Sequence, residues 1–493
     1  MTASNWLAVF PEIVLLVMAC VIALVDLFVA SPKRTPTLLL SAATLVVVGL
    51  MHFNAFLGGE TQYVMGRMLV VDPLGHLLAF FCCLATLVTL IYAQIYASSR
   101  DLLRGELFTL SLFSLLGISI MVAGNNFLVI YLGLELMSLA LYALAALRRD
   151  HAPATEAAMK YFVLGALASG FLLYGLSMMY GATGSLDVPR VFEVLQSGQP
   201  NKQVMAFGLA FIVAGLAFKF GAVPFHMWVP DVYHGAPSAI TLLIAGAPKI
   251  AAFGMAFRLL VEGMSSQAAD WQQMLMVLSI CSLVIGNLAA IAQTNLKRML
   301  AYSTISQIGF MLLGFTPTVI AANTNSAING YSSAMFYLIT YVLTTLGSFG
   351  LIMLLARPGF EAEEVNDLAG LNKRSPVMAL AMAVFMFSLA GEPPAVGFYA
   401  KLAVLQSLVA TGESAYIWLA VFAVMMSLIG AFYYLRVVKV MYFEEPSDDH
   451  AIVAAPGAHA MLSANGLAVL LLGIFPGGLM AICSQAVLKA LGS

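Results

Sequence analysis

Charged residues are scarce in this 493-residue chain: they make up 9% of it, whereas 61% of its residues are hydrophobic. A soluble domain of this length does not need so much apolar surface. The composition therefore excludes a soluble protein and predicts an all-α chain that crosses a membrane many times. Because no linker or low-complexity tract interrupts it, residues 1–493 form a single membrane domain in this interpretation. No basic patch points to nucleic acid.

Cysteine is also scarce, and the five cysteines lie in apolar segments without a C-x-x-C pair. Iron–sulfur clusters and structural zinc need several thiolates or histidines that converge. No dinucleotide-binding fingerprint is present either, because the glycines fall within apolar helical runs. We therefore expect no cofactor and no metal on this chain, and any redox chemistry must lie on other chains.

The hydrophobic runs are long, and a helix needs about 20 apolar residues to span a bilayer. By that measure the chain has about fourteen spans. Their approximate limits are 5–28, 36–55, 73–97, 106–123, 126–147, 155–181, 203–222, 237–261, 272–292, 299–317, 330–356, 376–410, 415–442 and 460–490. The interval 222–237 is short, so it is either a loop between two spans or a break within one helix.

Basic residues in and beside the loops predict the orientation. Only Arg67, Arg190 and Lys202 fall in even-numbered loops, and the others lie in or next to odd-numbered loops. The positive-inside rule places the odd-numbered loops in the cytoplasm. Both termini are therefore expected on the periplasmic side.

Four lysines remain inside apolar spans, namely Lys160, Lys219, Lys249 and Lys401. A lysine at bilayer depth costs roughly 2.5–3.5 kcal/mol, so it usually faces a bundle interior or a water-filled cavity. A desolvated amine releases its proton more readily than an amine in water, and such amines joined by water and hydroxyls form a proton relay. Lys160 follows a cytoplasmic loop closely, so it is also compatible with a side chain that extends to the interface.

Prolines interrupt the chain beside the other three lysines, at 211–250 and at 385–401. A proline inside a helix removes a backbone donor and frees the carbonyl four residues earlier. The carbonyls freed in this way are those of Phe220, Ile244, Leu389 and Ala390. At membrane depth a free carbonyl persists only where protein or water satisfies it, so we expect a hydrated interior path at these breaks.

Two Gly/Pro-interrupted spans in corresponding places indicate an inverted repeat with a pathway near the midplane. The first five-helix repeat is expected at about 106–261 and the second at about 272–442, each with one broken helix. Peripheral helices then occupy 5–97 and 460–490. We infer the repeat from this pattern, because the sequence shows no strong letter-for-letter repeat.

Glu135 lies about ten residues into the fifth span, near mid-depth at a rise of about 1.5 Å per residue. A lone buried carboxylate takes up a proton, whereas a lysine partner keeps it ionised. Glu135 is therefore either half of a fixed ion pair or a movable partner that switches a lysine between holding and releasing a proton.

Other polar residues allow two interpretations each. His226 and His234 follow the seventh span and act either as a gate for protons or as helix caps. Polar residues of the tenth span either order water or pack helices; these are Ser303, Thr304, Ser306 and Gln307. Glu12 is assigned to the membrane interface, and the acidic run that contains Glu361, Glu363, Glu364 and Asp367 is assigned to a solvated loop.

With these residues in place, the chain resembles the antiporter-like subunits of respiratory complex I along nearly its whole length. The segments that carry the resemblance are FKFGAVPFHMWVPDVYHGAPSAI at 218–240, NLKRMLAYSTISQIGFMLLG at 295–314 and the region around Glu135. The chain looks most like the N-type branch. Its opening PEIVLLVMACVIALVDLF is of that type, Lys401 stands where M-type subunits have Glu, and the long lateral helix of L-type subunits is not expected after the last span.

The resemblance implies a proton-translocating subunit of NADH:quinone oxidoreductase in a bacterial inner membrane. Glu135 and Lys219 would interact, Lys249 would link the two halves, Lys401 would release protons to the periplasm, and Lys160 would lie near the uptake side. The resemblance also implies that NADH, FMN, iron–sulfur clusters and quinone belong to partner subunits. The expected partners are neighbouring antiporter-like and small membrane subunits.

Three positions depart from the family pattern. Gln307 stands where N-type subunits often have histidine, Glu392 stands at a usually apolar position, and Ala400 replaces a usual glycine. A relay through position 307 is therefore open to question, and Glu392 either alters the field around Lys401 or faces the loop.

Two other functions stay open. A cation/proton antiporter subunit of the related multi-subunit type has the same general features, although few carboxylates lie at depth for a sodium site of several oxygens. A membrane scaffold is disfavoured, because a scaffold gains nothing from the insertion cost of buried lysines.

Overall fold

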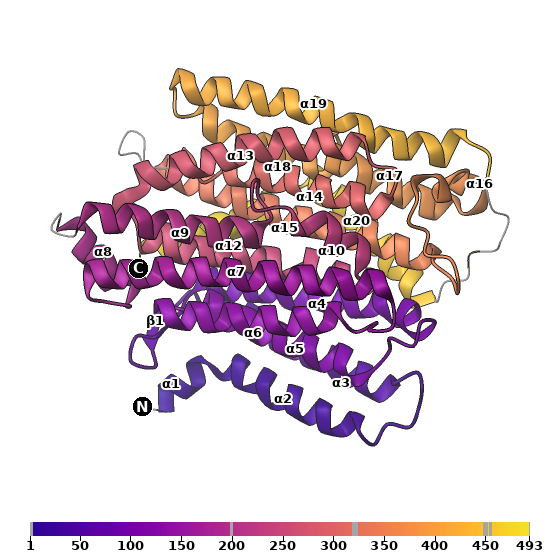
Figure 1. Ribbon diagram of the computed structural model, residues 1–493, viewed down its shortest axis with the longest axis horizontal. Coiled ribbons are helices and arrows are strands. Elements are labelled where there is room, and N and C mark those ends of the chain that lie inside the picture. The colour runs from indigo at the N-terminus through magenta and orange to yellow at the C-terminus, as the bar shows by residue number, and fades with distance from the viewer. Residues whose placement is uncertain (1–2, 198–200, 318–323, 447–451, 453–455, 493) are drawn as a thin grey trace.

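The computed structural model describes all residues except 1–2, 198–200, 318–323, 447–451, 453–455 and 493. Long helices lie side by side along the longest axis of the molecule, and both chain termini lie at the same end of it (Figure 1). In the described residues, eleven helices are long and apolar enough to cross a membrane, and three shorter apolar helices accompany them. The prediction of an all-α, multi-pass membrane protein is therefore confirmed.

The N-terminal part is a group of helices joined by a short hairpin. Its elements are α1 (Ala3–Ala8), α2 (Phe10–Asp26), α3 (Thr35–Gly58), the strands β1 (Gln62–Val64) and β2 (Leu69–Val71), and α4 (Pro73–Ser98). The two strands pair antiparallel, with Tyr63 opposite Val70. Asp72 follows the hairpin and caps α4, because its side chain accepts a hydrogen bond of 2.8 Å from the backbone N–H of Gly75.

The first half of the core follows. Its elements are α5 (Gly105–Val122), α6 (Phe127–Ala145), α7 (Ala152–Thr183), α8 (Val188–Gln196), α9 (Lys202–Phe220), α10 (Trp228–Gly235), α11 (Ser238–Ala245), α12 (Ala247–Ala256) and the π-helical segment η1 (Phe257–Glu262). The interval 222–237 thus holds the short helix α10, and the predicted span 237–261 is divided into α11, α12 and η1. Pro248 lies in the first turn of α12, where its missing N–H is tolerated.

The second half contains η2 (Ser265–Gln267), α13 (Ala268–Ile291), α14 (Leu296–Leu313), α15 (Thr324–Leu355), η3 (Val365–Leu368), α16 (Leu371–Arg374), α17 (Pro376–Ala390), α18 (Val396–Val409) and α19 (Ser414–Phe443). The helices α20 (Pro456–Ile474) and α21 (Gly477–Leu491) end the chain. The span expected at 460–490 therefore consists of two helices. Pro476 separates two helices there, because it has no N–H to continue α20.

Glycines let two helix pairs touch at their backbones. A Cβ at Gly117 of α5 would lie 2.4 Å from the backbone N of Met137 and 2.6 Å from the carbonyl O of Gly133 in α6. In the second half, a Cβ at Gly286 of α13 would lie 2.6 Å from the backbone N of Ser306 in α14. Small residues permit such close approach in membranes, and this packing fixes α6 and α14, which carry the polar residues of the interior.

We expect Gly117→Val to reduce the amount of assembled chain in the membrane several-fold. Overpacking costs roughly 1–3 kcal/mol, and here the added carbons meet backbone atoms that cannot rotate away. The matched control is Gly170→Val in α7, because no heavy atom lies within 4 Å of a Cβ at Gly170. Membrane levels of tagged chains measure the effect, and equal levels of the two variants contradict it.

Candidate functional site

Helices α9 and α17 both end inside the bundle, at glycines with positive φ. Gly221 has φ 77° and Gly391 has φ 89°, a conformation that favours glycine at a helix C-terminus. Prolines follow both glycines, at Pro224 and at Pro393 and Pro394. The two proline breaks predicted from the sequence are therefore present.

A lysine amine binds the open end of each broken helix. Nζ of Lys249 donates to the carbonyl O of Phe220 at 2.8 Å and of Lys219 at 3.3 Å. The C-terminal end of a helix carries partial negative charge, so it stabilises a cation. The indole N–H of Trp228 donates to the carbonyl O of Phe218 at 2.9 Å. The centre of the Trp228 ring lies 5.1 Å from the Lys249 ammonium.

The second break repeats this arrangement with a lysine from the following helix. Nζ of Lys401 in α18 donates to the carbonyl O of Ala390 at 2.7 Å and of Leu389 at 3.0 Å, and to Oγ of Ser427 at 2.8 Å. The freed carbonyls of Phe220, Leu389 and Ala390 thus all accept hydrogen bonds from buried amines. Among the described residues, the fourth predicted carbonyl, that of Ile244, does not accept a hydrogen bond from a buried amine.

Lys219 lies near the end of α9, and its amine points toward α6. It donates to Oγ of Ser138 at 2.8 Å and lies 3.5 Å from the hydroxyl of Tyr142. Glu135 is one turn before Ser138 on α6. Among the described residues, Glu135 and Lys219 do not form an ion pair, and Oε1 of Glu135 is buried without a hydrogen-bond partner. The carboxylate and the amine expected to interact are therefore neighbours that each retain bonding capacity.

Gln307 of α14 belongs to the polar cluster around Lys401. Its side-chain amide donates to the carbonyl O of Leu389 and to the hydroxyl of Tyr434, both at 2.9 Å, and it accepts from the hydroxyl of Tyr337. Lys401 and Gln307 thus share one carbonyl. Beside them lies a cavity of about 10 Å³, lined also by Thr340, Tyr341, Thr344 and Ser388, which is about the space that one water molecule needs.

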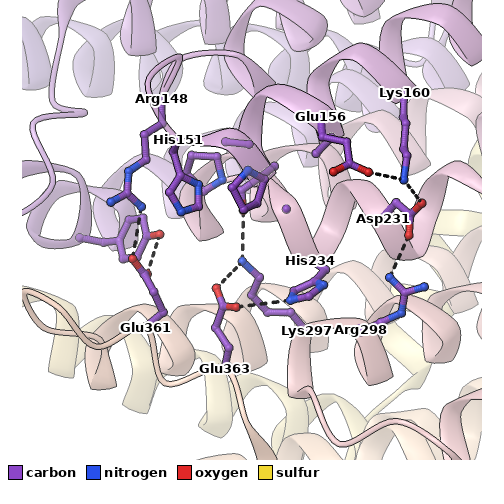
Figure 2. A pocket seen from close by; sticks show the side chains of 17 residues that line it. Arg148, His151, Glu156, Lys160, Asp231, His234, Lys297, Arg298, Glu361 and Glu363 are labelled. Atoms are coloured by element: carbon purple, nitrogen blue, oxygen red, sulfur yellow. Dashed lines mark hydrogen bonds and ion pairs between the residues drawn. The ribbon is translucent and has the colours of Figure 1, made fainter.

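A larger cavity of about 420 Å³ lies between the start of α7, the end of α10 and the start of α14 (Figure 2). Lys160 lies here, with its amine 2.8 Å from carboxylate oxygens of Asp231 and of Glu156. Arg298 binds the other oxygen of Asp231 at 2.8 Å. The Lys160 side chain is 42% exposed. Of the two interpretations, this exposure favours a side chain that extends to a polar environment, because it enters an open polar cavity near the start of α7.

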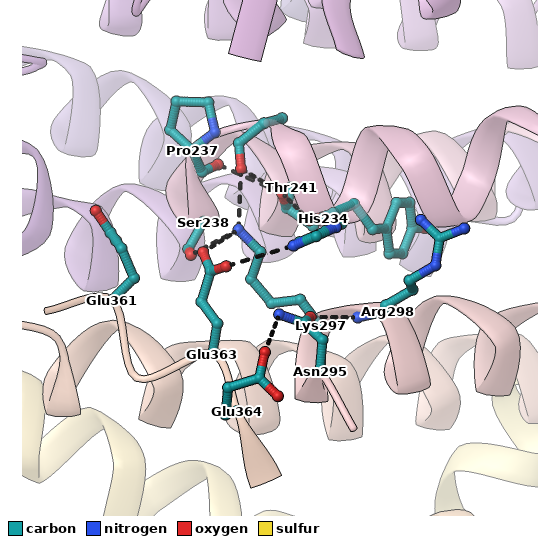
Figure 3. Close-up of polar contacts among 12 residues, drawn as sticks. His234, Pro237, Ser238, Thr241, Asn295, Lys297, Arg298, Glu361, Glu363 and Glu364 are labelled. Carbon is teal, nitrogen blue, oxygen red and sulfur yellow. Dashed lines mark hydrogen bonds and ion pairs between the residues drawn. The ribbon is translucent and has the colours of Figure 1, made fainter. Parts of the chain in front are cut away.

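The far wall of this cavity is the segment before η3, which the sequence interpretation assigned to a solvated loop. Glu363 instead binds Nζ of Lys297 at 2.8 Å, and Nε2 of His234 lies 3.9 Å from it (Figure 3). The backbone N–H of Val365 donates to the carbonyl of Thr294 at 2.9 Å and holds the segment against the start of α14. The Lys297 side chain is only 1% exposed. The Glu363 carboxylate is therefore part of a largely buried ion pair and does not lie in a solvated loop.

Glu361 closes one side of the cavity through Arg100 at 2.9 Å and Arg148 at 3.5 Å. Partial burial alone raises the pKa of a carboxyl, but the hydrogen bonds and charge of Arg100 bring the pKa of Glu361 below its ordinary value. The carboxylate therefore stays ionised at neutral pH.

The structure separates the two candidate histidines. His234 lines the large cavity with Lys160, whereas the residues that line this cavity do not include His226. His226 is half-buried on the connection between α9 and α10. Sequence reasoning gave no role to Asp231 or Arg298, and only the folded chain shows that Asp231 pairs with Lys160 across two helices. Within the described residues, His, Cys, Asp and Glu side chains do not gather in groups of three or more that could hold a metal ion.

Comparison with known proteins shows the family to which the chain belongs. Residues 124–430 match the family model described as "NADH:quinone oxidoreductase/Mrp antiporter, TM". The chain is similar to NADH-quinone oxidoreductase subunit N of Polaromonas naphthalenivorans, with 62% identity covering 98% of this chain and 97% of the relative. The same subunit of Herminiimonas arsenicoxydans is 59% identical over the whole of both chains.

Solved structures give the same result. A chain of respiratory complex I from Thermus thermophilus superposes with a TM-score of 0.80 and 30% identity, covering 97% of this chain and 100% of that one. A chain of the Mrp complex from Dietzia sp. DQ12-45-1b shares the fold, with a TM-score of 0.84 at 21% identity, covering 100% of this chain and 98% of that one. The chain belongs to the NADH:quinone oxidoreductase/Mrp antiporter family of membrane subunits. Within that family its place is among the N subunits of NADH-quinone oxidoreductase, respiratory complex I.

Proposed function

We propose that this chain carries protons across the membrane, from the side of the Lys160 cavity to the side of the chain termini, as one pumping unit of NADH-quinone oxidoreductase. The observation that supports this most is the pair of buried amines, Lys249 and Lys401, bound to the open ends of α9 and α17. A proton moved against 100 mV stores about 2.3 kcal/mol. Quinone reduction on partner subunits, which also hold NADH, FMN and the iron–sulfur clusters, supplies that free energy.

In this proposal protons enter at Lys160 and Asp231, where the cavity is open to water. Lys219 holds a proton beside Ser138 and passes it toward Lys249, whose amine already lies on the carbonyls of Lys219 and Phe220. The cluster of Gln307, tyrosines and hydroxyls then leads to Lys401. Lys401 releases the proton to the opposite side.

Glu135 controls Lys219 in this proposal. When the Glu135 carboxylate approaches the amine, the ammonium form of Lys219 is stabilised and the proton is held. When the amine stays on Ser138, as it does here, that stabilisation is weaker and the proton is released. The open Oε1 of Glu135 and the neutral partners of Lys219 suit a residue pair that moves between these two arrangements.

The two halves of the core are inverted repeats in this proposal, at about 106–261 and 272–442. Similar features recur at nearly constant spacing along the chain. Gly117 and Gly286 both make close helix crossings, Asn126 and Asn295 both cap the next helix, and Gly221 and Gly391 both end a broken helix. With α17 and α18 counted as one broken span and α20 and α21 as one kinked span, the total is about fourteen spans.

The proposed setting is a bacterial inner membrane with both termini in the periplasm. The bias of Lys and Arg toward odd-numbered loops supports this orientation. Both termini lie at one end of the molecule (Figure 1). The cavity with Lys160 is lined by Arg148 from the odd-numbered loop before α7, so in this proposal it opens to the cytoplasm.

Partner subunits cover the outer faces of the breaks in this proposal. Glu392, Pro393 and Pro394 are exposed between α17 and α18, each of which is too short to span the membrane alone. Irregular backbone and a carboxylate do not face lipid at that depth. A neighbouring antiporter-like or small membrane subunit that offers a hydrogen-bond donor to Glu392 therefore fits this surface.

The alternative is a cation/proton antiporter subunit, which the shared fold of the Mrp chain supports. Co-purification with an NADH-oxidising module separates the two functions. With the reconstituted complex, we expect replacement of sodium by choline to leave NADH-driven proton uptake unchanged. The carboxylates beside the proposed path, such as Asp231, are paired with amines, and the described residues contain no group of acidic side chains arranged to hold a cation. Loss of uptake without sodium supports the antiporter.

We expect Asp231→Asn to lower the number of protons pumped per NADH oxidised. The decrease should be several-fold smaller than the decrease caused by loss of a buried lysine. The change leaves Lys160 with Glu156 but removes the charge that joins it to Arg298. Glu193→Gln is the matched control, since it breaks an exposed ion pair with Arg190 at the other end of the molecule. Proton uptake by vesicles that contain the complex is measured, and a normal ratio in Asp231→Asn counts against the proposed uptake route.

A further inference from the structure

A second group of ionisable side chains lies near the end of the molecule that carries the chain termini, away from the lysines of the breaks. It surrounds a cavity of about 200 Å³ between α2, α3, α4 and α5. Glu12 comes from α2, His52 from α3, and Asp72 and His76 from the start of α4. Glu12 was expected at the interface, but its side chain is only 18% exposed and faces His52. Helices α3 and α5 pack against α2 and bury much of this side chain.

The two imidazoles are in direct contact. Nδ1 of His52 lies 3.0 Å from Nδ1 of His76, so one of these nitrogens carries a hydrogen and the other accepts it. Nε2 of His52 lies 3.9 Å from Oε1 of Glu12. This nitrogen is buried without a hydrogen-bond partner among the described residues, in a side chain that is only 1% exposed.

Carboxylates outnumber permanent positive charges around Glu12, His52 and His76. Arg258 of η1 binds Asp72 and Glu262, each at 2.6 Å, so one guanidinium faces two carboxylates. Oδ2 of Asp72 has no partner among the described residues. Glu12 is a third carboxylate, and Cys83 of α4 is a further titratable side chain near it. Three carboxyl groups thus share one permanent positive charge in a mostly buried site.

We propose that Glu12, His52 and His76 form a proton-binding site, separate from the lysine relay, in which one proton is shared between the carboxyl group and the imidazoles. With the proton on His52, Nδ1–H donates to His76 and Nε2–H faces the Glu12 carboxylate, so the charged imidazole bridges both neighbours. With the proton on Glu12, both imidazoles are neutral and one still donates to the other. The cavity has room for water to close the 3.9 Å gap.

The site is also tied to the core. Arg258 continues the helix of Lys249, because η1 follows α12 without interruption, and it also donates to the carbonyl O of Val122 at 3.0 Å. A change of charge at His52 therefore acts on Asp72 and Arg258 and, through them, on the end of that helix. Proton binding here does not depend on the proposed pumping function.

Infrared difference spectroscopy during a pH titration of the reconstituted complex tests this proposal without NADH. In the wild-type complex we expect a carboxyl C=O band that disappears in Glu12→Gln and that shifts in frequency in His52→Gln and His76→Gln. Glu60→Gln is the matched control, because Glu60 is exposed near the same end of the molecule and does not line the cavity. It is expected to leave the band unchanged.

A spectrum of Glu12→Gln identical to those of the wild type and Glu60→Gln overturns the proposal. Unchanged frequency in both histidine variants also overturns it, because the carboxyl then titrates alone. If Glu12→Gln is missing from the purified complex, Glu12→Asp replaces it, and the expected result becomes a shifted band. Because no electron transfer is involved, a failure of the pumping proposal leaves this result unaffected, and the reverse also holds.

Discussion

Lys219→Met is expected to stop nearly all proton transfer through this chain. The change removes the amine between Ser138 and the end of α9, so a proton must cross the same apolar distance without a group to hold it. A charge in that position costs roughly 2.5–3.5 kcal/mol more, which corresponds to about a 100-fold lower rate. The number of protons pumped per NADH by the reconstituted complex should fall by the whole share of this chain, measured with a pH-sensitive dye.

Lys219→Arg distinguishes a relay from a fixed ion pair. An arginine keeps the positive charge but does not release its proton, so pumping should stay low if Lys219 must give up a proton. Lys202→Met serves as the control, because Lys202 is exposed at the other end of α9. Normal pumping in Lys219→Met rejects the relay role, and restored pumping in Lys219→Arg shows that charge alone is needed there.

Lys401→Met is expected to block release of protons from the second half to a similar extent, about 100-fold for the flux through this chain. The break itself should survive, because Gln307 still donates to Leu389 and Ser427 still donates to Ala390 at 3.2 Å. The variant complex should therefore assemble normally, oxidise NADH more slowly and pump fewer protons per NADH.

Lys439→Met in α19 is the control for this second variant, since the Lys439 side chain is 70% exposed. The amount of chain in the purified complex is measured together with pumping. A complex that contains Lys401→Met in normal amount and pumps with the wild-type ratio refutes the assignment of Lys401 to the release side. Poor assembly alone points to a structural role of the amine at the α17 end.

The two halves of the core carry different side chains two residues before the glycine that ends the broken helix. Lys219, near the end of α9, directs its amine to Ser138 of α6, whereas Leu389 occupies the equivalent position of α17 and accepts from Gln307 of α14. The second half receives its amine from Lys401 on the other side of the break. Gln307 does not titrate, but its side chain connects the carbonyl of Leu389 to Tyr434 and Tyr337.

Much of the site was predictable from the sequence, because lysine in an apolar run and proline in a helix each impose a local cost. That cost indicated Lys219, Lys249 and Lys401, and it indicated three of the carbonyls that now accept from buried amines. The same reasoning did not show the surroundings of Lys160 and Glu12. Burial of a side chain near a span end depends on what other helices place around it, and hydropathy contains no such information.

The sequence by itself determined that this chain is a helical membrane protein, where its helices break, and which amines must find partners inside it. Each of these follows from the cost of leaving a charge or a backbone group unsatisfied in an apolar medium. Only the tertiary structure decided which partners they find. Asp231 meets Lys160, Glu363 meets Lys297, and His52 meets His76 because helices distant in sequence pack together, and pair contacts of this kind are set by packing geometry rather than by local composition.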